Sequence, residues 1–217
     1  MTPQVAAALT GPVLGATAVA ALLLVALAYT AVGALVTIAH ESGHTLFGVL
    51  TGQGVEHFRV IIGGRGRTQP RTAGWWPARI LMVAAGYTAP PLLGLGGAAL
   101  LAAGKAWPLL WTVVALLALA LIKAEKEWTT FVVLLFGVAT GYVALYDAPR
   151  VQAGYAAGLV WILLFGGVRA AAQAGTQKDT DPDRLFLDTL IPRTIWKLGF
   201  IAFALYCLWK GFVILKS

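Results

Sequence analysis

Long apolar runs separated by short polar connections make up most of this chain. The first run continues from about Val13 to Leu50, where the polar stretch Thr51-Gly-Gln-Gly54 ends it. As a single helix this run would be roughly 57 Å long, about twice the hydrocarbon thickness of a bilayer. The helix must therefore tilt steeply, break near Thr30 to Gly33, or project from the membrane, and the pattern does not choose among these.

Five further apolar runs follow, and each predicts a transmembrane helix because its length approaches that of a membrane span. They cover approximately residues 78–103, 107–122, 128–146, 151–172 and 192–214. The pattern predicts an all-α polytopic membrane protein with about six transmembrane helices, in one domain covering residues 1–217. Inside the second run, Pro90-Pro91 interrupts the helical hydrogen-bond ladder, which is tolerable only where protein or a wet cavity satisfies the freed carbonyls.

The polar connection after the first run is too long for a structureless loop in a compact protein. Residues 55–62 are rich in β-branched and aromatic side chains, Gly63-Gly64 can form a turn, and residues 67–71 can return. We expect a small β-hairpin here, on the cytoplasmic face. It would either cap the helical bundle or offer an edge to an extended substrate strand.

Small residues at four-residue spacing occur in two of the later runs. Gly137 and Gly141 form one such pair, and Gly154 and Gly158 form another. Small residues let helix backbones approach closely in membranes. We expect these two faces to pack against neighbouring helices of the same chain.

The composition supports a membrane protein rather than a soluble domain, since 59% of the residues are hydrophobic and only 12% are charged. The net charge of +7 does not indicate nucleic-acid binding, because the cations are dispersed among apolar segments. The single Cys207 excludes an internal disulfide.

The cations instead predict an orientation. Of the 16 Lys and Arg residues, twelve fall on alternate connections that lie on one side of a six-span protein. By the positive-inside rule this side is cytoplasmic, and both termini lie outside. The twelve are Arg59, Arg65, Arg67, Arg71, Arg79, Lys123, Lys126, Arg169, Lys178, Arg184, Arg193 and Lys197.

Candidate chemistry enters with the motif His40-Glu41-Ser-Gly-His44. No charged side chain precedes it, and ionisable groups at membrane depth are costly unless paired or ligated. Residues four apart share a helix face, so both imidazoles can bind one metal ion while Glu41 reaches a metal-held water. The alternative is a helix end at which His and Glu simply meet the lipid headgroups.

A catalytic zinc site needs a third protein ligand. Asp147 is excluded because it is expected at the opposite membrane face. The stretch Thr180-Asp-Pro182 predicts a helix start that can fold back toward the motif, although its carboxylates could equally serve only as helix caps. The residues that remain eligible are Asp179, Asp181, Asp183, Asp188, Glu125, Glu127, Glu56 and His57.

These features together resemble the site-2 protease family of intramembrane zinc metalloproteases, in its short M50B-like branch. The resemblance is carried by the motif inside an apolar helix, the Gly-rich hairpin, Gly86-Tyr-Thr-Ala-Pro-Pro-Leu-Leu-Gly94, and the segment around Asp181 before a final helix. It implies that His40, His44 and Asp181 bind Zn²⁺ and that Glu41 is the catalytic base.

The chain departs from that family in two ways: it contains no asparagine, and none of its Asp residues is followed by Gly. In the family, an Asn helps to stabilise the oxyanion and an Asp-Gly dipeptide supplies the third ligand. These two departures favour the alternative of a zinc-binding protein that does not cleave peptides.

We therefore expect an intramembrane zinc endopeptidase that cleaves a membrane-spanning segment by zinc-activated water, with Glu41 as general base. The first alternative is a non-proteolytic zinc-binding protein that acts as a subunit or assembly factor of a membrane complex. A second is a transporter with an ion relay at the motif. We expect an integral protein of a bacterial plasma membrane, with its active site toward the cytoplasm. Its expected partners are the lipid bilayer and a membrane-protein substrate or partner, and we expect no contact with nucleic acid.

Overall fold

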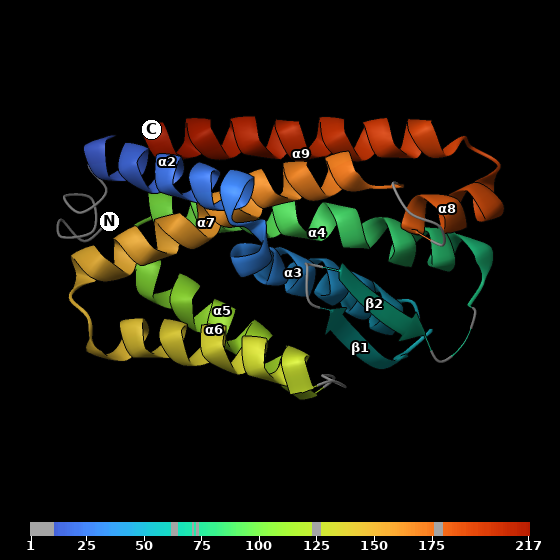
Figure 1. The fold of residues 1–217 in the computed structure, drawn as a ribbon, viewed down its shortest axis with the longest axis horizontal. Coiled ribbons are helices and arrows are strands. Elements are labelled where there is room, and N and C mark those ends of the chain that lie inside the picture. Colours follow the sequence, from blue (N-terminus) through green and yellow to red (C-terminus); the bar gives the residue numbers. More distant parts are fainter. Residues whose placement is uncertain (1–10, 62–64, 71, 73, 123–126, 176–179) are drawn as a thin grey trace.

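A computed structural model describes residues 11–61, 65–70, 72, 74–122, 127–175 and 180–217. With the labels of Figure 1, the described part consists of helices and one pair of strands. In chain order they are α2 (Gly11–Leu27), α3 (Tyr29–Leu50), β1 (Val55–Ile61), β2 (Arg65–Pro70), α4 (Trp76–Ala102), α5 (Ala106–Ile122), α6 (Glu127–Tyr146), α7 (Pro149–Gln173), α8 (Asp181–Thr189) and α9 (Arg193–Lys216).

The helices lie back and forth along the long axis of the molecule. Figure 1 shows the start of α2 and the end of α9 at one end of this axis, with α8 at the other end. The main core joins residues of α2, α3, α4, α5, α6, α7 and α9. A smaller cluster joins α8 to α7 and α9 through Leu185, Ala171 and Phe200. The segment that contains Asp181 is thereby attached to the end of the bundle.

Among the described residues, three helices are long and apolar enough to cross a membrane: α4, α7 and α9, with a fourth span if α2 and α3 count together. The predicted six spans are thus corrected to three or four in the described part of the chain. The apolar stretches of α5 and α6 have at most 17 residues, a rise of about 26 Å that falls short of the roughly 30 Å hydrocarbon core. The molecule is an integral membrane protein with two shorter apolar helices.

The first apolar run is broken at Ala28, where the helix bends by 89°. Of the three possibilities left open by the sequence, the broken helix is the one observed, slightly before the region considered. Arg169 of α7 explains the position, because its Nη1 donates to the carbonyls of Val25 (a short contact) and Ala26 (2.9 Å). The break leaves these carbonyls without their backbone N–H donors. The guanidinium of Arg169 also lies 4.4 Å from the ring centroid of Tyr29.

Close helix packing occurs at different glycines from those expected. A Cβ at Gly137, Gly154 or Gly158 would meet nothing within 4 Å, so the expected faces are not the closest contacts. On α4, by contrast, a Cβ at Gly94 would lie 2.8 Å from Leu164 Cγ. A Cβ at Gly167 of α7 would lie 2.9 Å from Pro91 Cδ. The α4–α7 pair is therefore one of the close seams of the bundle, and α4 continues as a helix through both prolines.

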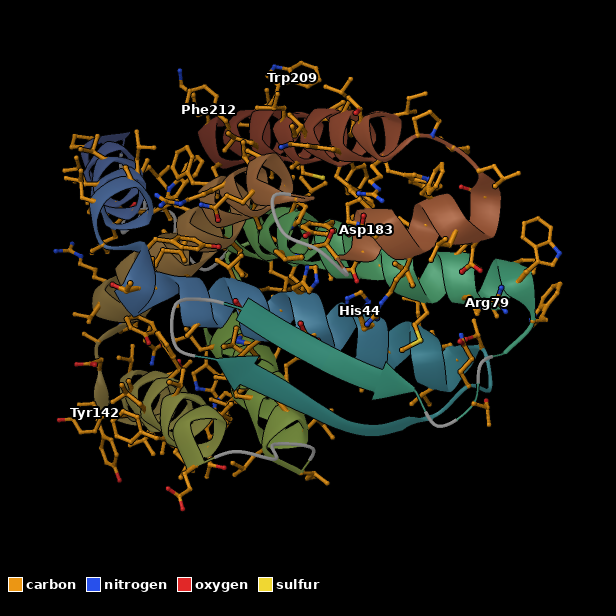
Figure 2. All side chains as sticks on the ribbon, turned by 45° about the vertical axis from the view of Figure 1, so that its right-hand side comes forward. His44, Arg79, Tyr142, Asp183, Trp209 and Phe212 are labelled. Atoms are coloured by element: carbon orange, nitrogen blue, oxygen red, sulfur yellow. The ribbon has the colours of Figure 1, made fainter. Side chains whose placement is uncertain are left out.

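The strands β1 and β2 pair antiparallel in the stretch where the sequence predicts a hairpin, with Arg59 opposite Arg67. Figure 2 shows them lying across α3. The buried Gln53 fixes the connection to α4, because its Nε2 donates to Thr51 Oγ1 (2.8 Å) and to the Ala78 carbonyl (3.0 Å). The predicted turn at Gly63-Gly64 and the returning Arg71 lie outside the described residues.

Candidate metal centre

Helix α3 brings His40 and His44 to one face, as their four-residue spacing predicts. Their Nε2 atoms lie 3.1 Å apart, and the rings meet edge to face with centroids 4.7 Å apart. The helix is uninterrupted through the motif, so the separation of the two imidazoles is set by the regular geometry of α3.

Asp181 reaches the same point from far along the chain. It is the first residue of α8, and its Oδ2 lies 3.1 Å from His40 Nε2 and 3.2 Å from His44 Nε2. Burial alone would raise the pKa of this carboxyl, but the imidazoles of His44 and His40 outweigh burial and hold the pKa below its ordinary value. This lowering requires protonated imidazoles, whereas a metal binds the ionised carboxylate together with neutral imidazoles.

The hydrogen bond of His44 on its other side fixes its tautomer. Nδ1 lies 2.8 Å from the Met82 carbonyl oxygen, which can only accept, so Nδ1 carries the proton of the neutral ring. The lone pair of His44 Nε2 then faces His40 and Asp181. Metal-binding histidines commonly donate their other N–H to a carbonyl in this way.

These atoms fit a zinc ion. His40, His44 and Asp181 are the one group among the described residues that brings three His, Cys, Asp or Glu ligand atoms together. Tetrahedral zinc with ligands at about 2.0–2.2 Å separates neighbouring ligand atoms by roughly 3.3–3.6 Å. The observed separations of 3.1, 3.1 and 3.2 Å are close to that triangle. Two imidazoles and one carboxylate form a familiar catalytic donor set, which leaves a coordination position for water or substrate.

The competing carboxylates of α8 have other partners. Asp183 Oδ2 accepts from the backbone N–H and the hydroxyl of Thr180 (2.9 Å each), and its Oδ1 lies 2.7 Å from Arg193 Nε. Burial raises its pKa, but these donors and Arg193 lower it below its ordinary value. Asp188 pairs with Arg79. The predicted helix start at Thr180 with Pro182 in the first turn is confirmed, and only Asp181 of these three carboxylates contacts the histidines.

Helix α4 forms the wall behind the imidazoles. A Cβ at Gly86 would lie 2.4 Å from His44 Nε2 and 2.8 Å from His40 Cε1, so only glycine leaves room for both rings. Gly43 of α3 allows the same approach, because its Cβ would lie 2.5 Å from the Ala85 carbonyl. Tyr87 meets His40 edge to face, with ring centroids 4.6 Å apart.

Glu41 lies on α3 beside His40 and is only 1% exposed. A carboxylate in such surroundings is costly to bury and is retained where it is paired or has a chemical task. The side chains of His40 and Asp181 are 16% and 13% exposed, so the cluster is not completely closed off from its surroundings.

The remaining candidate ligands do not join this cluster in the described part of the chain. Glu127 is exposed at the start of α6. Glu56 and His57 lie on β1, and their side chains are outside what the structure describes. Glu125 and Asp179 lie outside the described residues altogether.

The fold and the site define a helical integral membrane protein with a His–His–Asp cluster on its motif helix. A family model described as Peptidase M50B-like matches residues 13–211. The chain therefore belongs to the Peptidase M50B-like family, and the resemblance drawn from its motifs is confirmed. Searches among curated proteins and among solved structures found no significant match.

The sequence gives no indication of three groups that support the cluster. The Met82 carbonyl is a backbone atom, so no side-chain pattern marks it. The ion pair between Arg79 and Asp188 joins residues 109 positions apart, which only the tertiary structure brings together. Gly86 begins a stretch that carries the family resemblance, but the sequence does not show that its missing side chain makes room for the imidazoles.

Proposed function

We propose that this protein is an intramembrane zinc endopeptidase, in which His40, His44 and Asp181 hold the ion and Glu41 is the general base. The observation that carries the proposal is the triangle of Nε2, Nε2 and Oδ2 atoms with sides of 3.1–3.2 Å on an apolar helix. Membership of a peptidase family supports the same reading.

The side chains divide the work of peptide hydrolysis between them. When bound, zinc supplies Lewis acidity, which lowers the pKa of water and polarises a carbonyl. Glu41 takes the proton from the attacking water and returns it to the leaving amine nitrogen as the C–N bond breaks. His44, oriented by Met82, and Asp181 keep the acceptor atoms directed at one point.

The substrate class follows from the surroundings. The motif helix is part of the apolar bundle, so a segment that reaches His40 comes from within the membrane. A helical segment shields its own carbonyls by hydrogen bonding and must unwind before it is cleaved. We therefore propose a membrane-spanning segment of another protein as substrate.

We propose further that the site opens toward the cytoplasm. The end of the molecule that holds α8 also holds the start of α4 and the start of α9 (Figure 1). Arg79, Arg184, Arg193 and Lys197 lie on these segments, which agrees with a cytoplasmic face under the positive-inside rule.

A second candidate is a non-proteolytic zinc protein that serves as a subunit or assembly factor. It is favoured by the lack of any Asn and by Pro182, rather than Gly, after Asp181. In this case the ion would hold α3 and α8 together without hydrolysis.

One set of measurements separates the candidates. Metal analysis of purified wild type should find one zinc, and His44→Ala should lose it. Since the same donor set also suits iron, finding iron or no metal would contradict the zinc site. In proteoliposomes with single-span test substrates, Glu41→Gln should keep the metal and lose about 10²–10⁴-fold in cleavage rate, the usual contribution of a general base. Cleavage that survives Glu41→Gln would rule out the proposed base, and a metal-loaded wild type without cleavage of any substrate would favour the assembly role.

A further inference from the structure

The ion pair between Arg79 of α4 and Asp188 of α8 has a fork-like geometry. Arg79 Nε lies 3.1 Å from Asp188 Oδ1 and 3.2 Å from Oδ2, and Nη2 donates to Oδ1 at short range. The Asp188 side chain is only 15% exposed, against 38% for Arg79. Two guanidinium nitrogens on one carboxylate fix direction as well as distance.

The same helix contacts the other half of the metal centre. Arg79 precedes Met82 by three residues, which is close to one helical turn. The Met82 carbonyl accepts from His44, as described above, so the first turns of α4 contact α3 through Met82 and α8 through Arg79. Figure 2 shows Arg79 on α4 at the end of the bundle near α8.

Helix α8 presents Asp181 and Asp188 on one face. They are seven residues apart, which is nearly two full turns and about 10.5 Å along the axis. The face that carries Asp181 to the imidazoles is thus the face that carries Asp188 to Arg79. A rotation of α8 that broke the fork would also move Asp181 Oδ2 away from His40 and His44.

The other contacts of α8 fix this rotation less sharply. Leu185 is buried in an apolar cluster that includes Ile80 and Val83 of α4, but apolar packing is less directional than two hydrogen bonds to one carboxylate. The pair of Asp183 with Arg193 joins α8 to α9 rather than to α4. Among the described residues, the Arg79–Asp188 fork is the ion pair that connects α8 to the helix oriented against His44.

We propose that Arg79 and Asp188 are positioning residues, which set α8 against α4 so that Asp181 completes the metal centre. The proposal rests on the proposed function in that Asp181 is taken as a ligand. The fork holds the carboxylate ligand from one end of α8, while Thr180 and Asp183 cap the other end.

The test compares four variants of the full chain in nanodiscs: Asp188→Asn, Arg79→Gln, the exchange Arg79→Asp with Asp188→Arg, and Arg184→Gln. Arg184 is the matched control, because it lies on α8 and makes no ion pair with the described residues. Zinc affinity is measured by competition with a chelator. Hydrogen exchange of amides 181–189 reports the attachment of α8, and the visible spectrum of bound Co²⁺ reports its ligands.

We expect Asp188→Asn and Arg79→Gln each to weaken zinc binding about 10-fold, as loss of a supporting group around a metal site does. Both should change the Co²⁺ spectrum and speed exchange in α8. The exchanged pair should recover most of the affinity, and Arg184→Gln should match wild type. A purely structural role would lower thermal stability without altering the spectrum of bound Co²⁺.

Two results would overturn the proposal. Unchanged zinc affinity and an unchanged Co²⁺ spectrum in Asp188→Asn would show that the fork does not position Asp181, while the metal centre itself stands. If wild type binds neither Zn²⁺ nor Co²⁺, the proposed function fails. Hydrogen exchange alone then decides whether the fork attaches α8 to α4. In that case faster exchange in Asp188→Asn but not in Arg184→Gln supports the fork, and equal exchange in the two overturns it.

Discussion

At the residue scale, the candidate chemistry depends on three atoms from two distant parts of the chain. His40 and Asp181 are 141 residues apart, yet their ligand atoms lie 3.1 Å from each other. Like-charged or lone-pair-bearing atoms do not gather in this way without a shared cation or proton, because each acceptor otherwise repels the next. The cluster therefore makes the ligand assignment directly testable.

Replacing Asp181 by Ala should weaken zinc binding by about 100-fold or more, beyond the 10–100-fold typical of groups that only support a ligand. Glu127→Ala is the matched control, because this carboxylate is exposed at the start of α6 and was itself a candidate ligand. Zinc affinity by chelator competition checks both. Equal affinities in Asp181→Ala and wild type would remove Asp181 from the ligand set.

Gly86→Ala tests the wall behind the imidazoles. Its Cβ would lie 2.4 Å from His44 Cε1 and Nε2, so the ring must shift and zinc affinity should fall about 10-fold or more. Gly96→Ala on the same helix is the control, since its Cβ would meet nothing within 4 Å. Circular dichroism should show the same helix content in both. Wild-type zinc affinity in Gly86→Ala would mean that α3 and α4 can move apart to accommodate the added methyl group.

The sequence identifies part of this site for physical reasons. The spacing of His40 and His44 on a charge-free helix is local information, and the structure reproduces it. Asp181 was selected from eight eligible residues only by family resemblance, because no local pattern tells which carboxylate folds back. The structure brings Asp181 to the histidines, and its role as a ligand stays a prediction. The Met82 carbonyl leaves no signal in the sequence at all.

At the element scale, the break between α2 and α3 has no local cause. The cap residue is Ala28, and neither Pro nor Gly stands there. The freed carbonyls instead receive hydrogen bonds from Arg169 on α7, 143 to 144 residues away. The length of the run leaves a steep tilt, a break or a projecting helix open, and the position of the break depends on this tertiary contact.

Arg169→Gln should therefore destabilise the protein by about 1–3 kcal/mol, the usual cost of leaving buried polar groups unsatisfied. The matched control is Arg150→Gln, which removes an exposed cation near the other end of the same helix. Unfolding in a denaturing detergent titration gives the two free energies. Equal stability of the two variants would show that Arg169 does not hold the bend.

Glycine spacing was a poor guide to which helices pack most closely. Gly137 and Gly154 begin four-residue small-residue pairs but face open space, whereas Gly94 and Gly167 lie in the α4–α7 seam. A small residue permits close approach without requiring it, and the partner helix decides whether the space is used. Pro91 lies in the same seam, because Gly167 makes room for its ring.

At the scale of the whole molecule, each predicted apolar run is helical, but apolar runs are not equivalent to spans. The 89° bend divides the first run, and α5 with the described apolar part of α6 is short for a bilayer. The side of the membrane on which the later segments lie does not depend on how far α5 and α6 enter the bilayer. As consecutive helices joined by a short connection, they return the chain to its starting side whether both cross or neither does.

This parity leads to a prediction for the chain ends. With the α2–α3 pair as one span and α4, α7 and α9 as three more, both ends lie on one side and the hairpin on the other. Figure 1 agrees, since the start of α2 and the end of α9 lie opposite α8. In a Cys207→Ala background, Gln69→Cys on β2 should react with a membrane-impermeant thiol reagent only from the cytoplasmic side. Ser217→Cys should react only from the outer side. Labelling of both from one side would exclude the odd number of crossings predicted between Gln69 and Ser217. Labelling of Gln69→Cys only from the outside would reverse the orientation, because the twelve cations would then lie on the outer face.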